Sequence, residues 1–237
     1  MGEEGAANRS VPQARLIRSY QCSFLAVDRV LGLANLSAFA LNCSLKPSPA
    51  SSSSELLLRQ VLDELARHGV SGSLERLVDH NVKPGVTSDE GEGDDWPELR
   101  KRILAADIFI LGAPIWIGHP SSLAQRVLER MDAFLGETDD MGRMVSYGTV
   151  AGVAIVGNED GAHHVTAELY QGLADVGFTI PPNAVTYWVG GAMQKTDYND
   201  LEETPVETDQ ATKMMVRNII HVARLLKENP YPGDPDE

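Results

Sequence analysis

The chain has 237 residues, 43% of them hydrophobic, and is therefore long enough to enclose one sizeable core. Its 34 acidic side chains outnumber the 20 basic ones, and the resulting net charge of −14 argues against nucleic acid and anionic membranes as partners. The two cysteines, Cys22 and Cys43, are too few for a disulfide framework or for an iron–sulfur cluster.

The amino-terminal region lacks the features of a targeting segment. No apolar run reaches the roughly 18 residues of a membrane span, and Glu3 and Glu4 stand where a secretory signal carries basic residues. We therefore expect a protein of the reducing cytoplasm. Residues 1–20 show no sustained hydrophobic period, and residues 24–36 are apolar enough for a short helix or a strand extension. Residues 1–35 are therefore expected to form a mobile or partly helical N-terminal extension. One domain is expected over residues 36–231, with a C-terminal tail over residues 232–237.

Short apolar runs alternate with helical patterns along the rest of the chain. Buried strands are expected over residues 37–43, 74–78, 108–113, 150–156 and 184–189. Helices are expected over residues 55–68, 96–106, 121–135, 166–176 and 208–227. The acidic, glycine-rich segment between His80 and Asp95 is expected to be a solvated loop.

This alternation predicts an α/β fold with a five-stranded parallel sheet, because each parallel crossover needs a helix. Right-handed crossovers restrict the topology to doubly wound forms with helices on both faces. For five strands, the flavodoxin-like order 2-1-3-4-5 is the economical choice, and it binds ligands at the carboxyl ends of the strands. The loops after the first, third and fourth strands are therefore the candidate site.

The loop after the first strand, residues 44–54, is rich in hydroxyl groups. Unpaired backbone N–H groups and the positive end of the following helix point into such a loop. With Lys46 adding a charge, the loop is a candidate cradle for a phosphate group. Ordinary helix capping explains the serines as well, because Ser52 and Glu55 fit the pattern S-x-x-E. The chain lacks G-x-x-x-x-G-K-[ST] and G-x-G-x-x-G, which argues against a P-loop or a dinucleotide site.

The loop after the third strand, residues 113–122, places Trp116 and two isoleucines between prolines. An apolar, aromatic loop at the carboxyl end of a strand suits a flat heterocycle better than water. Alternatively, Trp116 packs beneath its own helix. We expect His119 to be a structural hydrogen-bonding residue rather than an acid or a base.

The loop after the fourth strand, residues 157–164, contains two glycines that allow the backbone to come close to a ligand. Its N–H groups can then bond to ring carbonyls. His163 and His164 point about 100° apart on a helix, which is a poor arrangement for a shared metal ion. No metal site is therefore predicted. No G-x-S-x-G motif is present, so a serine hydrolase has no support.

Together, three segments resemble the flavodoxin-like NAD(P)H-dependent FMN reductase family, including its quinone-reductase relatives. They are residues 42–47 with the serines that follow, residues 113–118 and residues 157–164, and the resemblance covers residues 37–231. It implies FMN as cofactor and NAD(P)H as electron donor. The implied phosphate-binding residues are Ser44, Lys46, Ser52, Ser53 and Ser54. The implied residues along the isoalloxazine ring and its polar edge are Pro114, Ile115, Trp116, Ile117, Gly118, Gly157, Asn158, Glu159, Asp160, Gly161 and His163. The first loop departs from the family pattern, because Ser53 stands where an asparagine is frequent.

The resemblance implies an FMN-dependent oxidoreductase that transfers hydride from NAD(P)H to a quinone, a free flavin or a similar small acceptor. No catalytic side chain is singled out, because the hydride chemistry belongs to the flavin. A flavodoxin-type electron carrier and a flavin-free interaction module remain as alternatives. The acidic surface suits a carrier, whereas the scarcity of aromatics in the loops, with Trp116 the one obvious ring, favours the enzyme. A homo-oligomer is the expected assembly.

Overall fold

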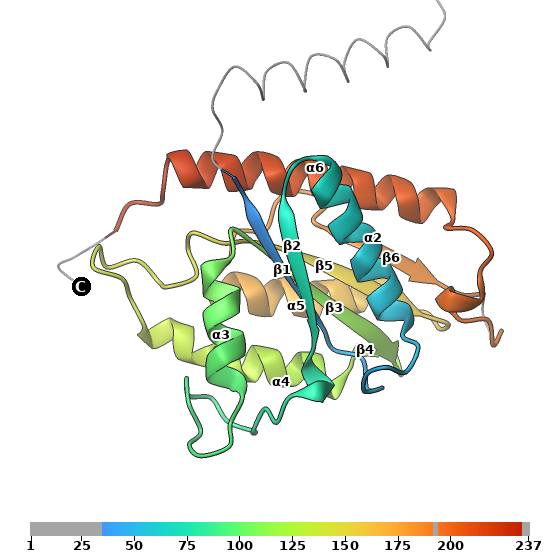
Figure 1. Ribbon diagram of the computed structural model, residues 1–237, viewed down its shortest axis with the longest axis horizontal. Coiled ribbons are helices and arrows are strands. Elements are labelled where there is room, and N and C mark those ends of the chain that lie inside the picture. Colours follow the sequence, from blue (N-terminus) through green and yellow to red (C-terminus); the bar gives the residue numbers. More distant parts are fainter. Residues whose placement is uncertain (1–34, 192–193, 234–237) are drawn as a thin grey trace, which may run out of the picture. The chain divides into compact units, whose positions relative to one another are not determined.

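In the computed structural model, five parallel strands form the centre of the fold, in the order β2-β1-β3-β5-β6 (Figure 1). Their bounds are Ser37–Asn42 (β1), Ser71–Arg76 (β2), Ile108–Trp116 (β3), Val150–Gly157 (β5) and Val185–Val189 (β6). The short strand β4, His119–Pro120, pairs antiparallel with the end of β3 and lies off this path. Counted without β4, the order is 2-1-3-4-5, which confirms the flavodoxin-like prediction.

The structure describes residues 35–191 and 194–233. The predicted N-terminal extension over residues 1–35 and the predicted tail over residues 232–237 therefore fall almost entirely outside the described residues. Within the described ranges, no helix combines the length and the apolar character that a membrane span requires.

Helices cover both faces of the sheet, as Figure 1 shows. One face carries α2 (Ser53–Arg67) and α6 (Val206–Glu228), whose inward side chains share an apolar cluster with the strands. The other face carries α3 (Trp96–Ala105), α4 (Ser122–Met131) and α5 (Ala162–Asp175), which build a second cluster. Because helices cover both faces, the central strands are buried on both sides and read as continuous apolar runs.

The structure corrects two predicted strand boundaries. The second strand is β2 rather than residues 74–78, and Leu77–Asp79 forms a 3-10 turn, η1. Strand β2 lies at the edge of the sheet, and its first three residues are polar or small and exposed, so an apolar pattern is missing there. The third strand continues to Trp116, so Pro114 and Ile115, expected in a loop, belong to β3.

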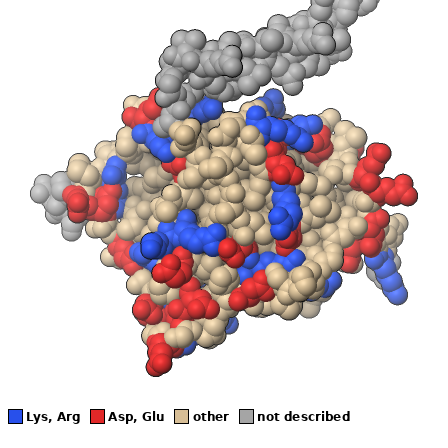
Figure 2. Space-filling view, viewed as in Figure 1, with Lys and Arg blue, Asp and Glu red and all other residues tan. Residues whose placement is uncertain are grey.

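The acidic loop between η1 and α3 is anchored to the core, so the prediction of a simply solvated loop is wrong. Figure 2 shows acidic side chains gathered at the lower end of this face, over that loop. Asp94 forms an ion pair of 2.8 Å with Arg130 of α4, and both side chains are fully buried. Arg130 also donates hydrogen bonds of 2.9 Å to the carbonyl oxygens of Lys83 and Thr87. Burial acts to raise the pKa of Asp94, but the backbone N–H of Glu90 and the Arg130 guanidinium hold that pKa below its usual range.

Candidate functional site

The carboxyl ends of four strands bring four loops to one edge of the sheet (Figure 1). We call them the first loop (residues 43–52, after β1), the second loop (residues 117–121, after β3), the third loop (residues 158–161, after β5) and the fourth loop (residues 190–205, after β6). The first three follow the strands that the sequence singles out. The fourth was not predicted, although Gly190 and Gly191 directly after the fifth strand signal a loop at this edge.

Three serine hydroxyls at the start of α2 accept hydrogen bonds from nitrogen donors. Ser52 Oγ caps the helix by accepting from a backbone N–H of its first turn at 3.2 Å, and it also accepts from Asn42 Nδ2 at 3.3 Å. Asn199 of the fourth loop donates from its side chain to Ser51 Oγ at 2.8 Å and from its backbone to Ser53 Oγ at 3.4 Å. Because nitrogen supplies the proton in each bond, each hydroxyl keeps its own proton for a further acceptor. Three such O–H groups beside a helix N-terminus form a donor set that suits an anion.

The remaining predicted residues of the first loop lie close by, but not all of them are accessible. Ser54 and Ser44 are nearly buried, at 3% and 6% exposure, as is the capping residue Ser52 at 8%, whereas Lys46 is exposed. The carbonyl oxygen of Lys46 accepts a hydrogen bond of 3.1 Å from Arg76, which is itself buried and paired with Glu55. Arg76 therefore fixes the loop, and the Glu55 carboxylate balances its positive charge. Arg76 is the last residue of the edge strand β2, and the sequence pattern did not identify it as a site residue.

The second and third loops touch each other through two glycines. Gly161 has a φ of 126°, and a Cβ placed there would lie 2.9 Å from the Cα of Gly118. The Glu159 carboxylate accepts a hydrogen bond of 2.9 Å from the backbone N–H of Ile117. Supported in this way, Trp116 and Ile117 stay 52% and 88% exposed, so Trp116 does not pack beneath its own helix. Two exposed apolar side chains at the loop edge form a surface that a flat, apolar ligand can cover.

The other predicted ring-contacting residues divide into core and edge positions. Ile115 is only 3% exposed and belongs to the core, so its expected role along a ligand is corrected. The Ile115 side chain packs against Gly157, and a Cβ built on Gly157 would lie 2.8 Å from the Cβ of Ile115. Asp160 is exposed and accepts the backbone N–H of Gly161 at 2.7 Å. His163 Nε2 lies 3.2 Å from the hydroxyl of Tyr187 on β6.

The fourth loop connects the first loop to the third. Asp197 accepts a hydrogen bond of 3.0 Å from Asn158 Nδ2, two residues before Asn199 reaches the serines of the first loop. The buried Tyr198 between them donates to Gln60 Oε1 at 2.7 Å. The fourth loop thereby becomes a strap across the site, and we refer to residues 197–199 as the strap.

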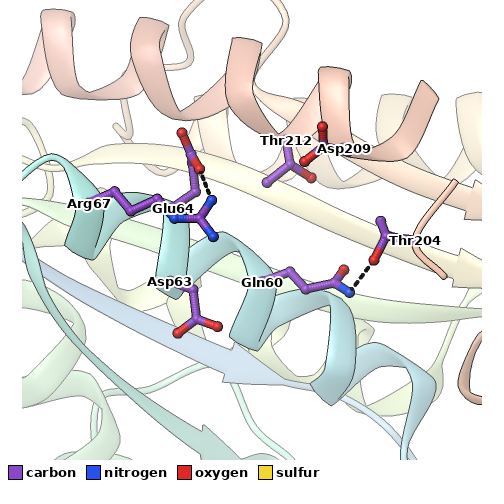
Figure 3. A pocket seen from close by; sticks show the side chains of 7 residues that line it. All are labelled: Gln60, Asp63, Glu64, Arg67, Thr204, Asp209 and Thr212. Atoms are coloured by element: carbon purple, nitrogen blue, oxygen red, sulfur yellow. Dashed lines mark hydrogen bonds and ion pairs between the residues drawn. The ribbon is translucent and has the colours of Figure 1, made fainter. Parts of the chain in front are cut away.

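A small cavity of about 150 Å³ lies beside Gln60, between α2 and the start of α6. Figure 3 shows Gln60 bonded to Thr204, at 2.9 Å, on one side of it. A larger cavity of about 300 Å³ lies near Tyr147 and Tyr231, among residues that precede the strands rather than follow them. Neither of these two cavities lies over the exposed residues of the second loop, so neither is the candidate site.

Three side chains meet between the second loop and α5. His119 Nδ1 lies 2.8 Å from Glu168 Oε1, and His164 Nδ1 lies 3.0 Å from the same oxygen. His164 Nδ1 is also 3.0 Å from the carbonyl oxygen of Gly118. His163 and His164 diverge as the helical spacing predicts, but the meeting of His119, His164 and Glu168 was not predicted.

Comparisons with known proteins agree with this geometry. Residues 37–193 match the family described as NADPH-dependent FMN reductase. An 8-demethyl-8-aminoriboflavin-5'-phosphate synthase from Streptomyces davaonensis is 32% identical over 209 residues, which cover 84% of this chain and 81% of that protein. The divalent metal cation transporter MntH from Mycobacterium bovis is 36% identical over 199 residues; these cover 81% of this chain, which spans only 29% of the length of that relative.

Solved structures show the same fold. The crystal structure of RosB with the bound intermediate 8-demethyl-8-formylriboflavin-5'-phosphate has a TM-score of 0.75 and 31% identity, and the match covers 83% of this chain and 82% of that one. A flavone reductase with a TM-score of 0.59, 14% identity and coverage of 85% and 69% is similar in fold alone. Since the family match spans more than half of the chain, the protein belongs to the NADPH-dependent FMN reductase family.

Proposed function

We propose that the protein binds FMN at the loop edge and transfers hydride from NAD(P)H to a quinone, a free flavin or a similar small acceptor, as a cytoplasmic homo-oligomer. The observation that carries the proposal is the donor set of the first loop. Three serine hydroxyls with protons available stand at the N-terminus of α2, close to an exposed apolar edge. A molecule with a phosphate at one end and a flat ring at the other matches both features.

The phosphate end is assigned to the first loop. Ser51, Ser52 and Ser53 donate their hydroxyl protons, the N–H groups in the first turn of α2 add backbone donors, and the exposed Lys46 contributes positive charge. Arg76 holds the loop through the Lys46 carbonyl oxygen. A hydrogen bond to a charged group contributes about 1.5–3 kcal/mol, so the phosphate accounts for a large part of the affinity. FMN therefore binds much more tightly than riboflavin.

The ring end is assigned to the second and third loops. Trp116 and Ile117 offer apolar area, and Glu159 holds the turn that carries them. When bound, FMN supplies the hydride-accepting chemistry, and the protein positions it and leaves room for the nicotinamide and then for the acceptor. An open edge with one exposed aromatic ring supports an enzyme with an accessible flavin, rather than a carrier that covers its flavin with two aromatics.

A second candidate function treats the flavin as substrate. It is favoured by the likeness to an 8-demethyl-8-aminoriboflavin-5'-phosphate synthase and to RosB with its formylated intermediate, over more than four fifths of each chain. The compound in the synthase's name and the intermediate bound to RosB are both riboflavin 5'-phosphates, so the same donor set serves either function.

Purified full-length protein, titrated with FMN and riboflavin and followed by flavin fluorescence, tests the site. The rate of NAD(P)H oxidation with and without a quinone, and the mass of the flavin after turnover, then separate the functions. Rapid NAD(P)H oxidation with an unchanged flavin mass supports the reductase, whereas a changed mass supports the second candidate. Bound flavin without NAD(P)H oxidation by any acceptor favours an electron carrier. Unchanged fluorescence at micromolar protein contradicts the FMN site and favours an interaction module.

A further inference from the structure

We propose that His119, His164 and Glu168 bind a first-row divalent transition-metal ion, with Zn²⁺ as the best match. The proposal stands on the geometry of these side chains and does not depend on flavin binding. Each residue offers one ligand atom, and the three atoms all lie within 4.8 Å of one another.

The distances suit a metal ion after small side-chain movements. Zn²⁺ lies about 2.0–2.2 Å from imidazole nitrogen and carboxylate oxygen, so two of its ligands are at most about 4.4 Å apart. The two nitrogen–oxygen separations of 2.8 and 3.0 Å therefore need to open slightly, whereas ligand atoms near the upper limit of 4.8 Å need to come slightly closer. The side chains of His119, His164 and Glu168 are 63%, 57% and 35% exposed, which allows this adjustment without disturbing the core.

The chemistry of the cluster also fits. Two neutral imidazoles and one carboxylate are a common protein ligand set for Zn²⁺, and a water molecule completes the fourth position. His164 and Glu168 are four residues apart on α5, so the helix presents both on one face. In the metal-free state, both imidazoles share a single carboxylate oxygen, and a cation would satisfy the two ring nitrogens and that oxygen at once.

His119, the third ligand, lies on a different element from the other two and would link that element to α5. His119 belongs to β4 and pairs with Trp116 across the turn, whereas the other two ligands lie on α5. A bound ion would therefore tie the turn that carries Trp116 and Ile117 to the helix. We infer that the ion braces the apolar edge of the loop site rather than taking part in hydride transfer.

Untagged full-length protein, first dialysed against a chelator, tests the proposal. Calorimetric titration with Zn²⁺ should give one site per chain, and Co²⁺ should give the visible absorption of a tetrahedral complex. His119→Ala and Glu168→Gln should each weaken binding by about ten-fold or more, because each removes a direct ligand. Two controls should bind like the wild type: His163→Ala, whose side chain is directed at Tyr187, and His221→Ala, an exposed histidine on α6.

Thermal unfolding guards against a folding artefact. Zn²⁺ should raise the Tm of the wild type and of both controls, but not that of Glu168→Gln, while the metal-free Tm values stay close to one another. Equal, saturable Zn²⁺ binding in all variants would mean that the ion binds to other surface histidines, and this result would overturn the proposed site. So would an absence of saturable Zn²⁺ binding by the wild type.

Discussion

Replacing Gly161 by alanine tests whether the second and third loops support each other. An L-residue at a φ of 126° pays a backbone cost of about 1–2 kcal/mol. The new Cβ would also lie 2.9 Å from the Cα and 3.0 Å from the carbonyl oxygen of Gly118, and these backbone atoms cannot rotate away. Overpacking of this kind costs about 1–3 kcal/mol. The sum of about 2–5 kcal/mol predicts a fall in Tm of roughly 5–15 °C for a domain of this size.

The matched control is Gly91→Ala. Gly91 has a φ of 85°, and no described atom lies within 4 Å of a Cβ built there, so this variant pays the backbone cost without the clash. Thermal unfolding followed by circular dichroism measures both losses. Fluorescence titration should show weaker FMN binding only in Gly161→Ala, because the displaced turn carries Trp116 and Ile117. Equal losses of Tm and unchanged FMN affinity in the two variants would refute the contact between the loops.

Four further predictions concern the core and the loop site. Arg130→Met should lower the free energy of unfolding in urea by about 3–5 kcal/mol, because it leaves the Asp94 carboxylate buried without its partner. Since the pKa of Asp94 is lowered in the folded state, its contribution to stability should be complete above about pH 4 and be lost as the pH falls toward the folded pKa. Unfolding measured against pH should therefore show a smaller acid loss in Asp94→Asn than in the wild type, and equal losses would contradict the prediction. Ser52→Ala should cost about 1 kcal/mol of stability as a lost helix cap and should weaken FMN more than riboflavin in paired titrations, whereas equal weakening would mean a cap alone. Trp116→Ala should change turnover and the KM of the acceptor in steady-state kinetics while FMN is largely retained, and unchanged kinetics would remove Trp116 from the site.

The interior of the sheet could be predicted because burial on both faces leaves a continuous apolar run in the sequence. Strands β3 and β5 carry such runs and begin where the sequence predicts, although β3 continues to Trp116, three residues beyond its predicted end. Strand β2 lies at the edge of the sheet and begins with Ser71 and Gly72, both exposed. Because these residues are not apolar, composition predicts the strand at residues 74–78, a few residues after its true start. The buried pair of Asp94 and Arg130 joins two distant segments, and no local pattern reveals such a contact.

The candidate site was predictable to the level of loops but not of side-chain partners. Parallel strands place their carboxyl ends at one edge, so the first three loops follow from strand order alone. The part played by Asn199 depends on the path of the fourth loop back across the site, which strand order does not set. Likewise, His119 meets Glu168 only because the short hairpin of β3 and β4 turns toward α5.

The strap makes the two ends of the site energetically interdependent. Asp197 holds Asn158 of the third loop, and Asn199 holds Ser51 and Ser53 of the first, within three consecutive residues. Tyr198, between these two residues, is buried and bonded to Gln60 of α2, so the strap is held in place from beneath. A shift of the first loop would therefore be passed through these three residues to the third loop, and a substitution at one end of the strap would also disturb the other end.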